Sequence, residues 1–204
     1  MHIDPKNLSR AQRYFRMIDV VVPRPIAWVS TLSASGVRNL APFSFFTGVS
    51  STPPCVMFSI APKRKGQIKD TLTNILATKE FVVNMVSRSH AKPMVQSSVE
   101  YASSEDEFTL CDLETVASSV VTPPRLKQTM AALECSLFST HEILDDDGRL
   151  GGTMVVGRVR SFYLADEAFD HEHKPNTEYA PIARLGGRAY AEIGTRFNLK
   201  PEMD

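Results

Sequence analysis

The chain has 204 residues, of which 43% are hydrophobic and 23% are charged, and its 23 basic and 23 acidic side chains balance. This composition is typical of a folded, water-soluble protein with one substantial core. Zero net charge provides no general attraction to nucleic acid or to an anionic membrane, so we expect neither partner. The N-terminus lacks the apolar run of a secretory signal, and no segment approaches the roughly 18–20 apolar residues of a membrane helix.

The first third of the chain predicts a helix and three strands. Apolar residues at helical spacing indicate a helix over residues 7–17, with Leu8, Ala11, Phe15 and Ile18 near one face. Alternating and apolar runs indicate strands over 26–32, 39–47 and 55–60. Since Pro42 has no N–H to donate to a strand ladder, we expect it at a sheet edge or a bulge.

The remainder of the chain predicts more strands than helices. We expect a helix over residues 70–77 capped by Asp70, a strand over 81–86 and a polar helical stretch over 88–98. A hairpin follows, with strands over 131–143 and 154–164 joined by the turn Asp145–Gly148, and a last strand is expected over 190–193. Strands that follow one another without regular intervening helices favour antiparallel pairing. We therefore predict a mainly β, Greek-key-like antiparallel barrel with a few decorating helices, in a single domain over residues 1–204.

The cysteines and histidines give no clear metal or disulfide pattern. No two of the three cysteines form a CxxC pair, and Cys55 and Cys135 lie in apolar runs where Cys acts as a small hydrophobic residue. A reduced, cytoplasmic protein is the expectation. His171 and His173 could face one side of a strand as a metal pair, but a third ligand is missing nearby, so we expect no metal.

Several common enzyme motifs are absent from the sequence. It contains no G-x-G-x-x-G after a strand, no phosphate loop of the ATPase type, no G-x-S-x-G and no H-E-x-x-H. The chain therefore offers no catalytic acid, base or nucleophile that spacing alone identifies.

A basic segment precedes the helix predicted from Asp70. Lys63–Lys65 and Lys69 bracket the start of this helix, and Asp70 and Thr71 stand in its first turn. Free N–H groups and the positive end of the dipole favour a phosphate at such a start. The alternative is an ordinary solvated basic loop.

Small polar side chains occur among the apolar residues of the first strands. They are Ser30, Thr31, Asn39, Ser44 and Ser59. A strand pair that lines a flat, partly polar ligand would need them, although such groups also bond to neighbouring backbone. Trp28 either belongs to the core or flanks a flat ring. Together with the basic helix start, these residues suggest a ligand with a planar polar head and a phosphate tail.

The same segments resemble the flavin reductase-like family, whose members have the FMN-binding split β-barrel fold. The matching motifs run in order over roughly residues 12–200 and include Arg24-Pro-Ile-Ala-Trp-Val-Ser-Thr31, Asn39-Leu-Ala-Pro-Phe-Ser-Phe-Phe46, Pro53-Pro-Cys-Val-Met-Phe-Ser59, Lys69-Asp-Thr71 with Asn74, Glu80-Phe-Val-Val-Asn84 and Arg184-Leu-Gly-Gly187 with Tyr190. This resemblance identifies a family well and a substrate poorly.

The resemblance implies a homodimer that binds FMN non-covalently near the subunit interface, with FAD less expected. It implies that Trp28, Ser30 and Thr31 border the flavin, that Asn39, Ala41, Pro42 and Ser44 face the polar edge of the ring, and that Ser59, Ile60, Lys69, Asp70 and Thr71 hold the ribityl chain and phosphate. Arg184 and Tyr190 would close the pocket, from the same chain or from the second subunit.

The resemblance also implies an oxidoreductase. The leading hypothesis is an NAD(P)H-dependent flavin reductase that delivers reduced flavin, in some cases to a partner oxygenase. This reaction needs no protein acid or base, because the cofactor supplies the redox chemistry. The alternatives are an FMN-binding electron carrier without nicotinamide turnover, similar to flavoredoxin, and an enzyme that acts on a small organic substrate with tightly held FMN.

Overall fold

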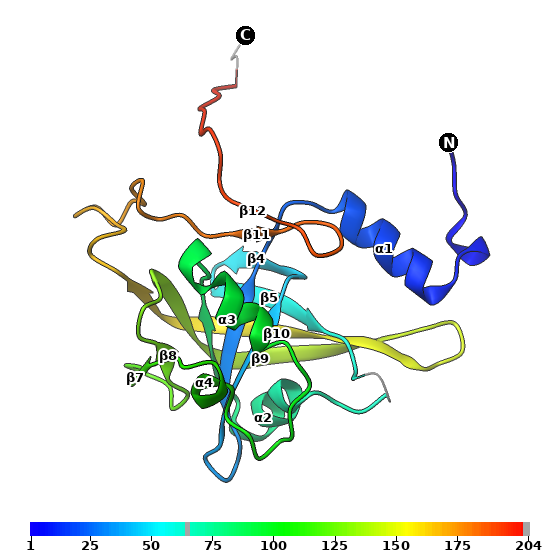
Figure 1. Ribbon diagram of the computed structural model, residues 1–204, viewed down its shortest axis with the longest axis horizontal. Helices are drawn as coiled ribbons and strands as arrows, with labels where there is room; N and C mark the ends of the chain where they lie inside the picture. Colours follow the sequence, from blue (N-terminus) through cyan, green and yellow to red (C-terminus); the bar gives the residue numbers. More distant parts are fainter. Residues whose placement is uncertain (64–65, 202–204) are drawn as a thin grey trace.

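The structure, a computed structural model, describes residues 1–63 and 66–201 and is dominated by one large antiparallel sheet (Figure 1). The strands of this sheet are β2 (Ala27–Leu32), β3 (Arg38–Phe43), β4 (Phe46–Ser51), β5 (Pro54–Ile60), β6 (Glu80–Asn84), β9 (Ala131–Leu144) and β10 (Leu150–Leu164). They lie in the order β3-β2-β6-β9-β10-β5-β4. Every neighbouring pair is antiparallel, so the predicted mainly β, antiparallel fold is confirmed.

Short elements surround this sheet. A three-stranded sheet contains β1 (Arg24–Pro25), β11 (Ala183–Arg184) and β12 (Tyr190–Ala191). A two-stranded sheet contains β7 (Thr115–Val116) and β8 (Arg125–Leu126). The helices are η1 (Pro5–Asn7), α1 (Arg10–Val20), α2 (Asp70–Thr78), η2 (Arg88–His90), α3 (Ala91–Gln96) and α4 (Glu107–Leu110). The last strand is therefore shorter than the predicted 190–193.

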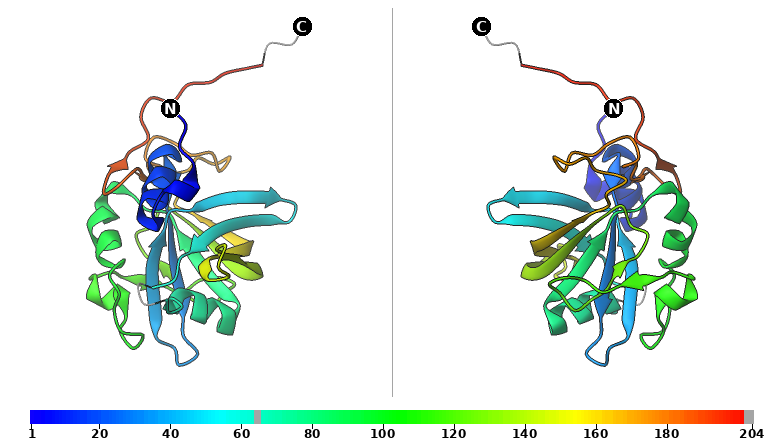
Figure 2. Two further views of the ribbon diagram at one scale, coloured as in Figure 1. Left: turned by 90° about the vertical axis from the view of Figure 1, so that its right-hand side faces the viewer. Right: turned by 90° about the vertical axis from the view of Figure 1, so that its left-hand side faces the viewer.

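The barrel is split where the chain passes from β3 to β4. We predicted one strand over 39–47, which is wrong, because the chain leaves β3 after Phe43 and starts β4 at Phe46 on the opposite edge of the sheet. The carbonyl of Phe45, in this crossing, accepts a hydrogen bond from the N–H of Ser59 at 2.9 Å. Figure 2 shows the β4–β5 pair projecting away from the β2–β3 hairpin. The predicted edge position of Pro42 is confirmed, since β3 is the end strand of the sheet and pairs with β2 alone among the described strands.

The barrel interior is an apolar cluster centred on aromatic rings. Phe58 lies between Phe43 and Phe81, with ring centroids 5.2 and 5.5 Å apart. Gly157 on β10 lies against the same cluster, and a Cβ added there would stand 2.2 Å from the Cζ atom of Phe81. The barrel therefore closes around Phe81 only because residue 157 has no side chain.

A second apolar cluster lies on the other face of β2. Ala27 and Val29 point into the barrel, whereas Ile26 and Trp28 pack in a cluster with residues that include Met94 of α3 and Phe108 of α4. Because successive residues of a strand face opposite sides, β2 is buried on both faces. Helices α3 and α4 thus form a layer over the outer side of β2 and β3.

Helix α1 begins and ends three residues later than the predicted 7–17, and it is mostly exposed. It begins at Arg10, because Ser9 and Gln12 form a reciprocal capping box with hydrogen bonds of 3.3 and 2.8 Å. Ile18 is the one buried residue of this helix among those described, and Phe15 is 49% exposed. Most side chains of α1 therefore lie outside the core, and Figure 1 shows the helix above the β9–β10 hairpin.

Helix α2 also begins differently from the prediction. Lys69, not Asp70, is the N-cap residue, and its carbonyl accepts from the N–H groups of Leu72 and Thr73. The Asp70 side chain does not cap the helix because it bonds instead to the ammonium group of Lys63 at 2.8 Å. The first turn of α2 thus carries no side-chain cap from its N-cap residue.

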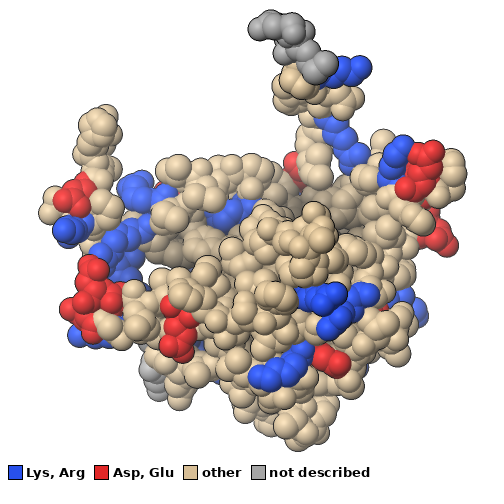
Figure 3. All heavy atoms as spheres, turned by 180° about the vertical axis from the view of Figure 1, so that it is seen from behind, with Lys and Arg blue, Asp and Glu red and all other residues tan. Residues whose placement is uncertain are grey.

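Other sequence predictions hold at the hairpin and the cysteines. Asp145–Gly148 turns β9 into β10 with a backbone bond from Gly148 N–H to Asp145. Cys55 and Cys135 are buried, and all three cysteines are free. Among the described residues, no helix is long and apolar enough to cross a membrane. On the face in Figure 3, small groups of basic and acidic side chains are separated by uncharged surface.

Candidate functional site

Three adjoining cavities meet at Pro42 of β3, at the open side of the split. They have volumes of about 50, 180 and 390 Å³, and Pro42 lines all three. Lys69 lines the first and third cavities, and Ser44 lines the second and third. We call this connected space the Pro42 cleft. It brings together eight of the residues predicted to bind the cofactor. They are Asn39, Ala41, Pro42, Ser44, Ser59, Lys69, Asp70 and Thr71.

The start of helix α2 forms one end of the Pro42 cleft. Lys69, Asp70 and Thr71 line the 50 Å³ cavity together with Lys63. The first N–H groups of a helix have no partner within the helix, and its N-terminus carries partial positive charge. Of the two lysines that line the 50 Å³ cavity, Lys63 is paired with Asp70, whereas Lys69 has no carboxylate partner among the described residues. Lys69 and the start of α2 therefore favour an anion at this end of the cleft, where Glu100 and Glu107 also line the cavity. Arg64 and Lys65 of the predicted basic loop lie outside the described residues.

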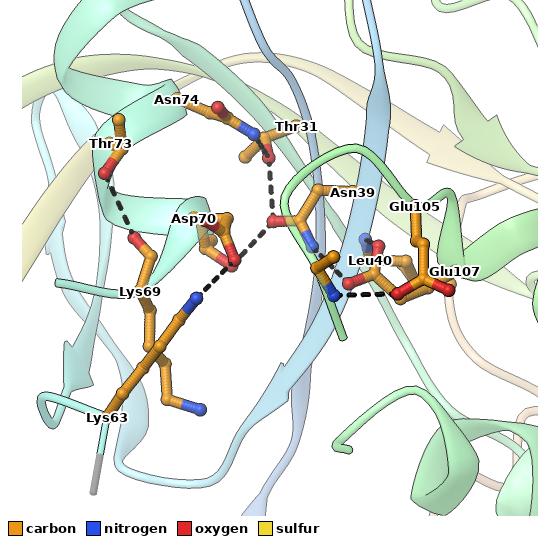
Figure 4. Close-up of polar contacts among 12 residues, drawn as sticks. Thr31, Asn39, Leu40, Lys63, Lys69, Asp70, Thr73, Asn74, Glu105 and Glu107 are labelled. Atoms are coloured by element: carbon orange, nitrogen blue, oxygen red, sulfur yellow. Dashed lines mark hydrogen bonds and ion pairs between the residues drawn. The ribbon is translucent and has the colours of Figure 1, made fainter. Parts of the chain in front are cut away.

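A buried network centred on Asn39 fixes this wall of the cleft (Figure 4). The Asn39 Oδ1 accepts from the hydroxyls of Thr31 and Thr71 at 3.2 and 2.9 Å. The Thr31 Oγ1 in turn accepts from Asn74 Nδ2 at 3.0 Å. These bonds tie β2, β3 and α2 to one another. The side chains of Thr31 and Thr71 therefore bond within the protein, although Thr71 also lines the 50 Å³ cavity.

Glu107 completes the network and was missed by the sequence analysis. Its carboxylate accepts from Asn39 Nδ2 at 2.9 Å and from the Leu40 N–H at 3.0 Å, and the residue is 7% exposed. Burial is the main cause of a raised pKa of Glu107, and the hydrogen bonds from Asn39 and Leu40 oppose it. In the sequence, Glu107 ends an acidic segment that looks like a solvated loop. The local sign of burial is the apolar residue after it, Phe108, which is fully buried in the structure.

Four predicted site residues do not line the cleft, and one of them, Thr31, belongs to the network behind its wall. Ser30 Oγ donates to the Pro124 carbonyl at 2.6 Å on the outer side of β2. Trp28 is fully buried, and its indole N–H donates to Ser97 Oγ at 2.9 Å. Ile60 is 2% exposed and belongs to the barrel core. Trp28 therefore acts from behind the wall, since the Ser97 that it holds lines the 50 Å³ cavity.

The other end of the cleft carries two guanidinium groups. Arg24, Arg184, Tyr14 and Tyr190 line the 180 Å³ cavity. Arg24 is 4% exposed and donates to the carbonyls of Ile18, Val21 and Leu185, which joins the end of α1 to β11. Arg184 bonds to the Tyr190 hydroxyl and stacks on its ring at 4.6 Å. Arg184 and Tyr190 of this chain therefore lie together at the cavity next to Pro42, and their closing of a cofactor pocket stays a prediction.

The metal alternative has little structural support. His171 and His173 lie in an exposed loop between β10 and β11. Within residues 1–63 and 66–201 there is no group of three or more His, Cys, Asp or Glu side chains placed to hold a metal ion.

Comparison with known proteins places this geometry in a family. The model described as "Flavin reductase like domain" matches residues 20–182. An uncharacterized protein of Aquifex aeolicus is 37% identical over 188 residues, which cover 92% of this chain and 93% of that protein. Nitrilotriacetate monooxygenase component B from Bacillus cereus has a similar structure, with a TM-score of 0.92, 28% identity and 98% of both chains covered. The 2-nitrobenzoate 2-nitroreductase NbaA from Pseudomonas fluorescens gives 0.86 and 29%, with 99% of this chain and 96% of that chain covered. The chain thus belongs to the flavin reductase-like domain family.

Proposed function

We propose that the protein binds FMN in the Pro42 cleft and acts as an NAD(P)H-dependent flavin reductase. The observation that carries this proposal is the order of groups along the cleft. One end offers Lys69 and the uncapped start of α2, and the middle offers the polar groups of Ser44 and Ser59 beside Pro42. This order suits a ligand with a phosphate at one end and a polar ring further along.

The residues at the α2 end fit a phosphate ester. Lys69 is free to place its ammonium group against a phosphate, and the N–H groups of Asp70 and Thr71 stand in the first turn of α2, where a helix favours anions. Charge-assisted hydrogen bonds of this type are stronger than neutral ones. The Asn39 network supports the wall from behind, so the backbone of this turn stays fixed when a ligand enters.

The middle of the cleft fits a ring with polar edges. Ala41, Pro42, Ser44 and Ser59 line it and expose backbone and hydroxyl groups between the edge of β3 and β5. When bound, FMN supplies the two-electron redox chemistry that this chain lacks. Protein N–H and hydroxyl donors near the ring would favour its more negative, reduced state. No protein acid or base is required for this role.

A second candidate function is electron transfer by bound FMN without nicotinamide turnover. No separate NAD(P)H motif occurs in the sequence, which keeps this alternative open. Anaerobic mixing of the FMN-loaded protein with NADH and with NADPH separates the two functions. Loss of the visible flavin absorption with either donor supports the reductase, and no loss with both donors supports the carrier.

We further propose a homodimer in which residues 1–204 form one domain. Tyr14, Phe15 and Met17 of α1 are between 49% and 54% exposed, so this helix has an apolar surface that a second copy could cover. The monooxygenase component B of Bacillus cereus supports delivery of reduced flavin to a partner oxygenase. The three free cysteines support a reducing compartment such as the cytoplasm. Light scattering of the purified protein tests the dimer.

The phosphate end gives the sharpest test of FMN binding. We expect Lys69→Gln to weaken FMN binding by about tenfold or more, since a charge-assisted contact is lost. Lys79→Gln is the matched control, because Lys79 is an exposed lysine at the opposite end of the same helix. Fluorescence quenching of added FMN gives the dissociation constants. Equal affinity in the two variants would place the phosphate elsewhere.

A further inference from the structure

The 180 Å³ cavity at the far end of the Pro42 cleft combines two cationic groups with aromatic and apolar walls. Arg24 and Arg184 supply the charge, and Tyr14 and Tyr190 supply the rings. Ile26, Met94 and Val95 also line it, and no Asp or Glu does. Within residues 1–63 and 66–201, neither guanidinium forms an ion pair with a carboxylate. A cavity with this lining carries positive charge that no carboxylate of its lining balances, and it is suited to an anion.

The two guanidinium groups also repel each other. Burial is the main cause of a lowered pKa of Arg24, the charge of Arg184 lowers it further, and Tyr14 and Asp19 partly oppose both effects. The Arg24 side chain is held by three backbone carbonyls, so it cannot move away from the cavity without breaking the link between α1 and β11. An anion in the cavity would offset this repulsion, because a negative charge close to both guanidinium groups stabilises their charged forms.

Arg184 is the group best placed to bind such an anion. Its hydrogen bonds go to the Tyr190 hydroxyl and to the Gly187 carbonyl, both on the β11–β12 hairpin, and its guanidinium lies over the Tyr190 ring. These contacts fix the plane of the guanidinium. A planar guanidinium matches a carboxylate with two parallel hydrogen bonds.

We infer that this cavity binds the carboxylate of a small aromatic acid, which is the substrate class of the proposed flavin site. The volume is below the usual range for drug-sized ligands, about 300–1,000 Å³, and therefore favours a single ring with one charged group. Pro42 and Ser44 are shared with the cavity assigned to the flavin, so the acid would lie next to the ring. The inference rests on the proposed function for this adjacency, but not for the binding of the anion itself.

Isothermal titration calorimetry with benzoate and with benzamide tests the inference on protein with and without saturating FMN. We expect benzoate to bind at least about tenfold more tightly than the neutral amide, since hydrogen bonds to charged groups account for such a factor. Arg184→Gln should remove this preference, and Arg184→Lys should keep part of it. Arg160→Gln is the matched control, because Arg160 is exposed on β10 and lies outside the cavity.

Different failures have different meanings in this experiment. Equal binding of benzoate and benzamide, or an unchanged preference in Arg184→Gln, would overturn the inference. Loss of FMN affinity in Arg184→Gln, with retained folding by circular dichroism, would also overturn it, since the cavity would then hold the phosphate of the cofactor. Benzoate selectivity in a protein that takes up no FMN would support the anion cavity and refute the proposed function.

Discussion

The fit of Phe81 against Gly157 allows a quantitative prediction for the barrel core. In Gly157→Ala the new Cβ would lie 2.2 Å from Phe81 Cζ. Carbon atoms pack at about 3.5–4.0 Å, so roughly 1.3 Å of separation must be gained by moving the ring or the strand. Phe81 is fully buried and its ring packs on Phe58 at 5.5 Å, so little free space is available.

We therefore expect Gly157→Ala to lower the free energy of unfolding by about 1–3 kcal/mol, the usual cost of overpacking a core. Urea denaturation followed by circular dichroism measures this change. Gly48→Ala is the control, because a Cβ at Gly48 meets nothing within 4 Å and its φ is not positive. This control should change stability by less than about 0.5 kcal/mol.

A double variant tests the cause of the loss. Phe81→Leu shortens the side chain that meets the new methyl group, so the double variant Gly157→Ala/Phe81→Leu should be more stable than the sum of the two single losses predicts. We expect a coupling of about 0.5–3 kcal/mol, as for residues in direct contact. Additive losses, or a Gly157→Ala variant as stable as the parent, would refute the reasoning.

Two further predictions concern the network behind the Pro42 cleft. Burial raises the pKa of Glu107 above its ordinary 4.5, so the folded protein holds this proton to a higher pH than the unfolded chain does. The contribution of this proton to the free energy of unfolding is complete below pH 4.5 and is lost as pH rises through the pKa of the folded protein. In urea titrations, the parent should therefore lose stability with rising pH relative to Glu107→Gln. The control Glu142→Gln, at an exposed position, should follow the parent at each pH. A stability difference between the parent and Glu107→Gln that does not change with pH would contradict this account. Asn39→Ala should cost about 2–4 kcal/mol, since it leaves buried groups without partners. Adding Thr71→Val should then cost less than it does in the parent; an equal cost in both backgrounds would show that the two side chains are not coupled.

Local sequence patterns were sufficient for most strands and for the family. The β9–β10 hairpin followed from its turn residues, and the edge position of β3 followed from Pro42, because both depend on backbone geometry that a single residue type imposes. The break between β3 and β4 did not follow, since Ser44 and Phe45 have no local signal for leaving a strand. The crossing is held by the hydrogen bond from the Ser59 N–H to the Phe45 carbonyl, which forms only when the barrel closes and brings these two segments together.

The candidate site was predicted less well than the fold. Ser30 and Thr31 are adjacent on one strand and therefore face opposite sides, so they could not both border one ligand. Their polarity indicated a partner for each, and only the packing of α2 and of the Pro124 segment decided that both partners belong to the protein. Glu107 was missed for the same reason, because an acidic segment has no local mark of burial.

The sequence by itself determined most of the strands, where helix α2 begins to within a residue, and to which family the chain belongs. Only the tertiary structure decided which polar groups face the cleft and which satisfy one another behind it. It also brought Arg24 and Arg184 from opposite ends of the chain into one cavity. Backbone preferences act between neighbours along the chain, whereas burial and charge act through space, so their outcome depends on contacts that no local pattern records.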